Sequence, residues 1–171
     1  MKLRNCIAAF AFPAVLVVNC SAQITSAHVA PAFSLALKSP SQSYKVAEPI
    51  TLGLTITNIS KSAIGLEAGP GMGQLERHFF VVAVGPDGKA VQERQYGLRV
   101  HGKAPRSSIP RLGSSYMEAI APGESVHHEI DFNKLYDFSE PGTYDLYVQR
   151  NYEAESGLLV KSNHIKIVVI E

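Results

Sequence analysis

Cysteine and tryptophan are nearly missing from this chain: it has two cysteines and no tryptophan. Both cysteines, Cys6 and Cys20, lie close to the N-terminus. A chain cleaved after Ala22 keeps 149 residues and no thiol. Such a chain has no disulfide, no cysteine-ligated zinc and no thiol nucleophile. We therefore expect a domain that is held together by its hydrophobic core alone, which about 150 residues can supply.

Long apolar runs are also missing beyond the first twenty residues, so the sequence predicts no transmembrane helix. Lys2 and Arg4 precede an apolar run over residues 7–18, and Ser21 and Ala22 are small. This order predicts a signal peptide over 1–22 and a periplasmic or secreted protein. The alternative is a lipoprotein anchored at Cys20, because an apolar residue stands three positions before that cysteine.

The chain has no excess of charge of either sign. Removal of residues 1–22 leaves 14 basic and 15 acidic residues, which gives no reason to expect nucleic acid or an anionic membrane as partner. The distribution is uneven, however. Residues 89–111 contain one acidic residue, Glu93, and six basic ones: Lys89, Arg94, Arg99, Lys103, Arg106 and Arg111.

Alternation of apolar and polar residues is the main structural signal. It is clearest over 50–57, where Ile50, Leu52, Leu54 and Ile56 alternate with Gly and Thr residues. Similar segments recur between turn signals, and no sustained helical period is present. The pattern predicts an all-β fold, an immunoglobulin-like antiparallel β-sandwich of seven to nine strands without a disulfide. We expect residues 23–43 to form a lead-in and a first edge strand, and 44–171 to form the sandwich.

Other segments are predicted less directly. The continuous apolar run over 79–84 is typical of a central strand, and Tyr96, Leu98 and Val100 alternate only weakly. Residues 133–138 suggest one turn of helix. Asn58-Ile59-Ser60 fits a glycosylation acceptor, which we interpret as accidental.

A corner followed by a strand lies over residues 135–148. Pro141-Gly142 makes the turn, and Tyr144 and Leu146 then point toward the same face of a strand. A Gly-x-Tyr at the start of a late strand is typical of the tyrosine corner, in which the phenol bonds to nearby backbone. Leu146 stands where an antibody domain has cysteine. We therefore expect Gly142, Tyr144, Leu146 and Leu54 to carry structural roles.

Four segments together resemble secreted bacterial immunoglobulin-like domains: EPITLGLTITNIS (48–60), FFVVAVGPDGK (79–89), IAPGESV (120–126) and IDFNKLYDFSEPGTYDLYV (130–148). The chain is similar to the non-catalytic β-sandwich of deuterolysin-like metalloproteases and to the small proteinase inhibitors of bacilli. The metalloproteases carry a His-Glu-x-x-His motif in a separate domain, and this chain has no such motif. The resemblance therefore implies an accessory, binding or inhibitory domain.

The basic, proline-containing loop over 102–113 is the strongest binding candidate, since loops on a rigid scaffold often carry function. Its candidate residues are Arg99, Lys103, Arg106 and Arg111. We predict a non-catalytic domain that binds an unknown protein. One alternative is a proteinase inhibitor that presents Arg106 or Arg111 to a protease, and another is an enzyme of unknown class.

No motif for a cofactor, a nucleotide or a catalytic triad is present, so we predict no cofactor and no enzymatic activity. His127, Glu129 and Asp131 would share one face of a strand, which leaves a weak surface metal site conceivable. The competing interpretation is a solvated face without metal, and we predict no metal ligands.

Overall fold

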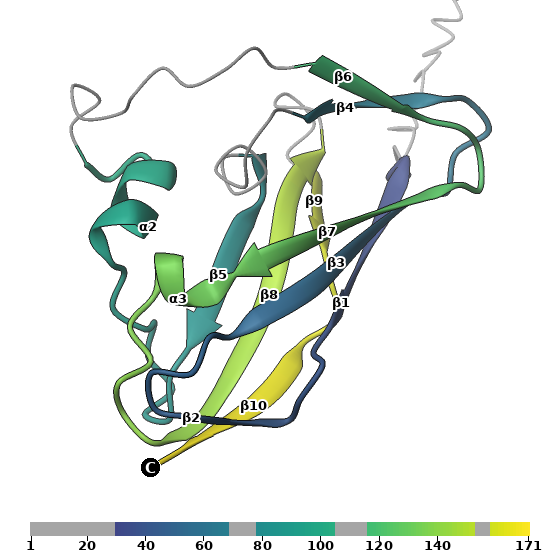
Figure 1. The fold of residues 1–171 in the computed structure, drawn as a ribbon. Helices are drawn as coiled ribbons and strands as arrows, with labels where there is room; N and C mark the ends of the chain where they lie inside the picture. The colour runs from purple at the N-terminus through teal and green to yellow at the C-terminus, as the bar shows by residue number, and fades with distance from the viewer. Residues whose placement is uncertain (1–29, 69–77, 105–115, 153–157) are drawn as a thin grey trace, which may run out of the picture.

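Two facing β-sheets form the body of this domain in the computed structural model, which describes residues 30–68, 78–104, 116–152 and 158–171 (Figure 1). One sheet has the strand order β1-β3-β7, and the other has the order β2-β10-β8-β5 with β9 paired to β8. A separate ribbon joins β4 and β6. The strands are β1 (Phe33–Lys38), β2 (Ser43–Lys45), β3 (Thr51–Asn58), β4 (Ile64–Ala68), β5 (Phe80–Val84), β6 (Tyr116–Ile120), β7 (Ser125–Asp131), β8 (Gly142–Tyr152), β9 (Leu158–Lys161) and β10 (Ile165–Ile170).

The structure confirms the predicted all-β sandwich, with ten strands in the described residues instead of seven to nine. Two short helices, α2 (Gln95–Val100) and α3 (Phe132–Leu135), accompany the sheets. α3 agrees with the helical turn expected near residue 133. The part of the chain that the structure describes contains no helix long and apolar enough to cross a bilayer. Cys6 and Cys20 lie outside the described residues.

Strand β3 is the centre of the three-stranded sheet and follows the predicted alternation. Leu52, Leu54 and Ile56 have no exposed surface, and they face the core between the sheets. Thr55 and Thr57 lie on the opposite face, where their hydroxyls bond to His127 and Ser125 of β7. This face is polar and wetted, as expected for an antiparallel sheet with one buried side.

The chain crosses from one sheet to the other at Pro40, between β1 and β2. β1 pairs with β3 at an edge of the three-stranded sheet, and β2 then pairs with β10 in the other sheet. The β2–β10 pairing is parallel, unlike the other strand pairs of the described residues. Pro40 favours the switch because proline donates no ladder hydrogen bond.

The side chain of Asn163 joins β1 to the five-stranded sheet. Its Nδ2 donates to the Leu37 carbonyl at 3.0 Å, and its Oδ1 accepts from the Leu37 N–H at 2.7 Å. The carboxamide thus bonds to both backbone groups of Leu37, as a neighbouring strand would do. This contact ties the edge of one sheet to the turn between β9 and β10 of the other.

The tyrosine corner forms as predicted. The Tyr144 hydroxyl donates to the Glu140 carbonyl at 2.6 Å, and the ring is buried. Burial, with a smaller effect of the Glu140 carboxylate, raises the pKa of Tyr144, so the hydroxyl remains a donor at neutral pH. Gly142 has a φ of 152°, and Leu146 is completely buried two residues after Tyr144. The corner therefore fixes the start of β8.

We expect Tyr144→Phe to lower the free energy of unfolding by about 1 kcal/mol, because the substitution removes one hydrogen bond and keeps the ring. Urea denaturation measures this change. Tyr147→Phe is the matched control, since Tyr147 lies half-buried on the outer face of the same strand. An equal effect of the two substitutions would contradict a role for the corner.

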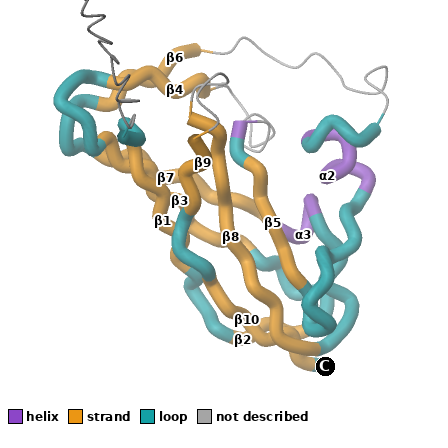
Figure 2. The backbone as a smooth tube through the Cα atoms, turned by 180° about the vertical axis from the view of Figure 1, so that it is seen from behind, coloured by secondary structure: helices purple, strands orange, loops and turns teal. Residues whose placement is uncertain are grey.

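Strand β5 lies at an edge of its sheet, so the predicted central position is wrong (Figure 2). Its outer edge is covered by loop backbone and by a side chain instead of a strand. The Ala83 carbonyl accepts from the Val91 N–H, and the Val81 carbonyl accepts from the Tyr136 hydroxyl. The apolar run arises because Val81 and Ala83 are buried in the core, while Phe80 and Val82 on the opposite face of the strand help to line a pocket that Val81 and Ala83 also border.

Asn58 is a buried structural residue at the end of β3. It has no exposed surface, its Nδ2 donates to the carbonyls of Ser62 and Ile120, and its Oδ1 accepts from the backbone N–H of Ser60. These bonds hold β3, the following turn and β6 together. The burial supports the interpretation that the Asn58-Ile59-Ser60 triplet is not an acceptor site.

A candidate binding pocket between β5 and α2

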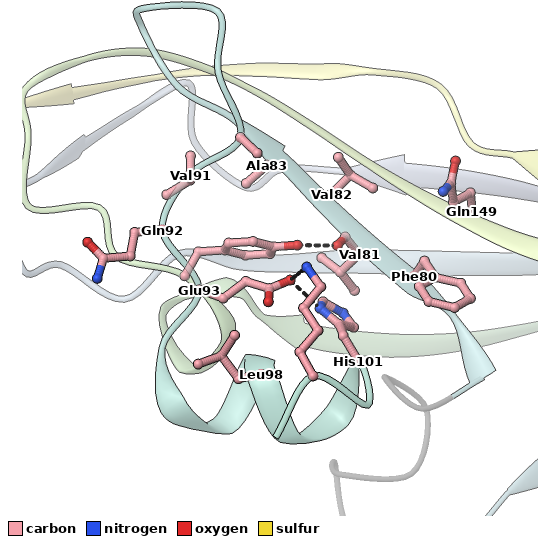
Figure 3. Close-up of a pocket in the computed structure, with 13 residues that line it drawn as sticks. Phe80, Val81, Val82, Ala83, Val91, Gln92, Glu93, Leu98, His101 and Gln149 are labelled. Atoms are coloured by element: carbon pink, nitrogen blue, oxygen red, sulfur yellow. Dashed lines mark hydrogen bonds and ion pairs between the residues drawn. The ribbon is translucent and has the colours of Figure 1, made fainter. Parts of the chain in front are cut away.

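A pocket of about 550 Å³ lies between β5 and the segment 90–103 (Figure 3). Its walls are mainly apolar, and several polar side chains converge at one end. Its lining residues are Phe80, Val81, Val82, Ala83, Ala90, Val91, Gln92, Glu93, Leu98, His101, Lys103, Tyr136 and Gln149. The pocket volume falls within the range of about 300–1,000 Å³ that small-molecule sites occupy.

The helix α2 forms one wall of this pocket, so the weak alternation of Tyr96, Leu98 and Val100 does not mark a strand. α2 docks on α3 through Gly97, where a Cβ would collide with the Leu135 carbonyl. The backbone N–H of Arg94 also donates to the Leu135 carbonyl, at 2.8 Å. The local sequence gives little preference for helix or strand over these residues. The contact with α3 therefore decides that the segment is helical. The helix then delivers His101 and Lys103 to the pocket.

Glu93, His101 and Lys103 form an ion-pair cluster at the polar end. Glu93 Oε1 lies 2.7 Å from His101 Nδ1 and 2.9 Å from Lys103 Nζ. The side chains of Glu93 and His101 are 10% and 5% exposed, whereas that of Lys103 is 60% exposed. Lys103 therefore covers the cluster from the solvent side, and the other two residues are almost enclosed.

Two opposing effects act on Glu93. Burial works to raise its pKa, but the hydrogen bonds from Lys103 and His101 together outweigh burial and hold the pKa below its usual value. Glu93 is therefore ionised at neutral pH. Because an ionised carboxylate only accepts hydrogen bonds, the proton between Glu93 and His101 lies on His101 Nδ1.

Tyr136 closes the inner side of the pocket. Its hydroxyl donates to the Val81 carbonyl, and burial together with the Glu93 carboxylate raises the pKa of this phenol. The Tyr136 ring lies 6.2 Å from the His101 ring, and the Phe80 ring stacks on His101 at 6.0 Å. Three rings thus stand side by side along the pocket.

We expect Glu93→Gln to lower the free energy of unfolding by about 1–3 kcal/mol at pH 7, because it removes a charge-assisted pair. The folded state lowers the pKa of Glu93 from 4.5, so this contribution is complete above pH 4.5. It is lost as the pH falls through the lower folded-state pKa. Urea denaturation at pH 7 and in acid measures the difference, which should shrink in acid. Glu129→Gln, at an exposed acid of β7, is the control.

The predicted site residues separate in the structure. Arg99 lies in the last turn of α2, with its Nε donating to the Gln95 carbonyl, and Lys103 pairs with Glu93. Arg106 and Arg111 lie outside the described residues, so the inhibitor hypothesis for the loop over 102–113 stays a prediction. The other bases of the stretch pair within the domain, Lys89 with Asp87 and Arg94 with Asp137.

No three His, Cys, Asp or Glu side chains of the described ranges are arranged to hold a metal ion. The three residues considered for a weak metal site have other bonds or stand apart. His127 Nδ1 bonds to the Thr55 hydroxyl, and Asp131 accepts from two backbone N–H groups at the start of α3. Glu129 is exposed on the outer face of β7.

Sequence reasoning missed Glu93, His101 and Tyr136. One signal was present, because Glu93 is the single acid among six bases over 89–111. A lone acid in a basic stretch is surrounded by partners for an ion pair. The sequence gives no comparable signal for Tyr136, which joins the pocket only because α3 lies against α2.

Comparisons with known proteins leave the family open. No family model matches the chain, and no curated protein matches it. Solved structures match the chain at low identity and low TM-score. The CARDB domain of the PF1109 protein from Pyrococcus furiosus has 10% identity and a TM-score of 0.38, with 82% of this chain and 89% of that chain covered.

Two enzymes of known structure match this chain with similar identity and TM-score. The alkylpurine DNA glycosylase AlkC from Pseudomonas fluorescens has 10% identity and a TM-score of 0.42, covering 82% of this chain and 31% of that chain. A β-glucosidase from Listeria innocua has 16% identity and a TM-score of 0.40, covering 81% and 16%. Likeness at this level assigns neither a family nor an activity. It also leaves the resemblance to deuterolysin-like proteases and bacillary inhibitors a prediction.

Proposed function

We propose that this chain is a non-catalytic binding domain, exported to the periplasm or the medium, whose pocket between β5 and α2 receives a side chain of a protein partner. The observation that carries the proposal is the enclosed Glu93–His101 pair at the end of an apolar pocket. Glu93 Oε2 and His101 Nε2 are buried and have no hydrogen-bond partner among the described residues. Buried polar atoms without partners are costly, and a bound group that supplies the bonds would remove this cost.

The composition of the pocket favours binding over catalysis. A histidine oriented by a carboxylate is half of a nucleophilic site, which also needs a hydroxyl or thiol within reach of the imidazole. Among the described residues, the 13 that line the pocket include no serine, threonine or cysteine. Lys103 is held by Glu93, and the Tyr136 hydroxyl is held by the Val81 carbonyl. Measured turnover that is lost in His101→Gln would contradict the proposal.

A displayed library of random peptides tests binding directly. We expect selection on the wild-type domain to enrich peptides whose binding is weakened at least tenfold by Phe80→Ala. Phe80 lines the pocket and is 44% exposed, whereas Val168, 40% exposed, does not line it. Val168→Ala is therefore the matched control. Failure to enrich any peptide, or equal loss in the two variants, would contradict the assigned site.

A further inference from the structure

The geometry points to a ligand group of defined chemistry: an aromatic ring that carries one O–H or N–H donor, as in the side chains of Tyr and Trp. This inference rests on the proposed binding function and names the group that the pocket takes. It follows from three properties of the pocket, which are the kind of unpaired atoms, the charge of the cluster and the nature of the walls.

One of the unpaired atoms is a carboxylate oxygen, which only accepts hydrogen bonds. Glu93 Oε1 receives His101 Nδ1 and Lys103 Nζ, which leaves Glu93 Oε2 with lone pairs and no partner among the described residues. His101 Nε2 is likewise unpaired among the described residues. A ligand that satisfies Glu93 Oε2 must donate a hydrogen bond, because an ionised carboxylate only accepts.

The charge of the cluster favours a neutral donor. The charges of Glu93 and Lys103 cancel. An ammonium group on the ligand would be repelled by Lys103 Nζ, which lies 2.9 Å from the Glu93 carboxylate. A carboxylate or phosphate would be repelled by the ionised Glu93. A hydroxyl, an indole N–H or an amide therefore fits the polar end best.

The walls favour an aromatic body for this donor. Phe80, His101 and Tyr136 place three rings beside the polar end, with centroid distances of 6.0 and 6.2 Å between neighbours. Offset and edge-on contacts between aromatic rings stabilise a complex beyond the effect of the buried apolar surface. Val82, Val91 and Leu98 supply aliphatic surface. A sugar, with many hydroxyls, would leave most of them unpaired here.

The most exposed parts of the wall lie on the solvent side. Phe80 is 44% exposed and Lys103 is 60% exposed, whereas His101 and Glu93 are enclosed behind them. A ring that enters between Phe80 and Lys103 meets His101 first. The donor is then placed toward Nε2 or Oε2, and the ring replaces solvent between Phe80 and Leu98.

Small probes separate the donor from the ring. The protein, with or without residues 1–22, is titrated with p-cresol, 4-methylanisole and cyclohexanol. NMR follows the backbone amide and histidine imidazole signals during each titration. We expect p-cresol to bind about tenfold more tightly than 4-methylanisole, which lacks the donor, as one hydrogen bond predicts. Cyclohexanol, which lacks the aromatic ring, should also bind more weakly. Saturating p-cresol should shift the His101 Nε2 signal as a new hydrogen bond would, whereas 4-methylanisole should not.

A variant and its matched control test whether p-cresol binds at His101. His101→Gln should reduce p-cresol affinity about tenfold, whereas His164→Gln should not. His164 is a matched control, because its Nδ1 also bonds a carboxylate, that of Asp145 at 2.9 Å, on an exposed surface. Should His101→Gln fail to fold, the His101 Nε2 signal of the wild type still decides the question.

The outcomes distinguish the two proposals. Equal binding of all three probes at the pocket would overturn the aromatic-donor inference and leave the binding site intact. Stronger binding of cyclohexanol than of p-cresol would do the same. If none of the probes shifts signals of pocket residues, the inference fails, and the peptide selection decides separately whether the pocket binds a partner.

Discussion

Leu54→Asp is expected to leave the chain unable to fold. Leu54 has no exposed surface, and it lies at the centre of β3, the middle strand of its sheet. The substitution removes a buried aliphatic side chain worth about 1.5–3 kcal/mol. It also places a carboxylate in the core, where an unpaired charge costs several kcal/mol more. The sum reaches the total stability of about 5–15 kcal/mol that is typical of a domain.

The measurement is the yield of soluble protein and the thermal transition followed by circular dichroism. Leu159→Asp is the matched control, because the same change is made at a residue of β9 that is 38% exposed. This control protein should be soluble and should melt cooperatively. A soluble Leu54→Asp protein with a cooperative transition would show that β3 is not the centre of the core.

Gly142→Ala is expected to lower the free energy of unfolding by about 2–4 kcal/mol, through backbone strain and steric overlap. The φ of 152° at Gly142 is one that residues with a Cβ rarely adopt. A Cβ there would also collide with the ring of Pro86 in the turn after β5. The substitution should therefore separate the start of β8 from that turn.

Urea denaturation measures the loss at Gly142. Gly53→Ala in β3 is the control, since the nearest atom to a Cβ at that position is the Lys38 carbonyl oxygen at 3.8 Å, an ordinary contact. We expect this control to change stability by less than about 1 kcal/mol. Similar losses in both variants would mean that the corner does not depend on glycine at 142.

The period of two in the sequence was sufficient to predict the sandwich, because each strand of the core exposes one face to water. β3 and β1 are clear examples, with alternate residues buried. The Tyr144 corner was predictable for a different reason: its turn, its phenol and its carbonyl acceptor lie within five residues. Features that depend on neighbours in the sequence are thus well predicted in this chain.

The pocket was not predictable, because its parts come together only in the folded chain. Val81 and Tyr136 are 55 residues apart, and their hydrogen bond exists because α3 lies beside the edge of β5. The helix α2 has little helical signal of its own and depends on docking at Gly97. The apolar run of β5 resembled a central strand because the residues on its outer face, Phe80 and Val82, are apolar too. They line the pocket and do not pack against another strand.

The Asn163 carboxamide has a consequence for how molecules of this protein meet one another. An unpaired strand edge is a template on which a second chain can add, and addition of this kind leads to aggregation. At Leu37 both backbone groups are already engaged by Asn163. A foreign strand would have to displace this side chain before it could extend the sheet past β1. One amide thus protects the border of the sheet against uncontrolled self-assembly.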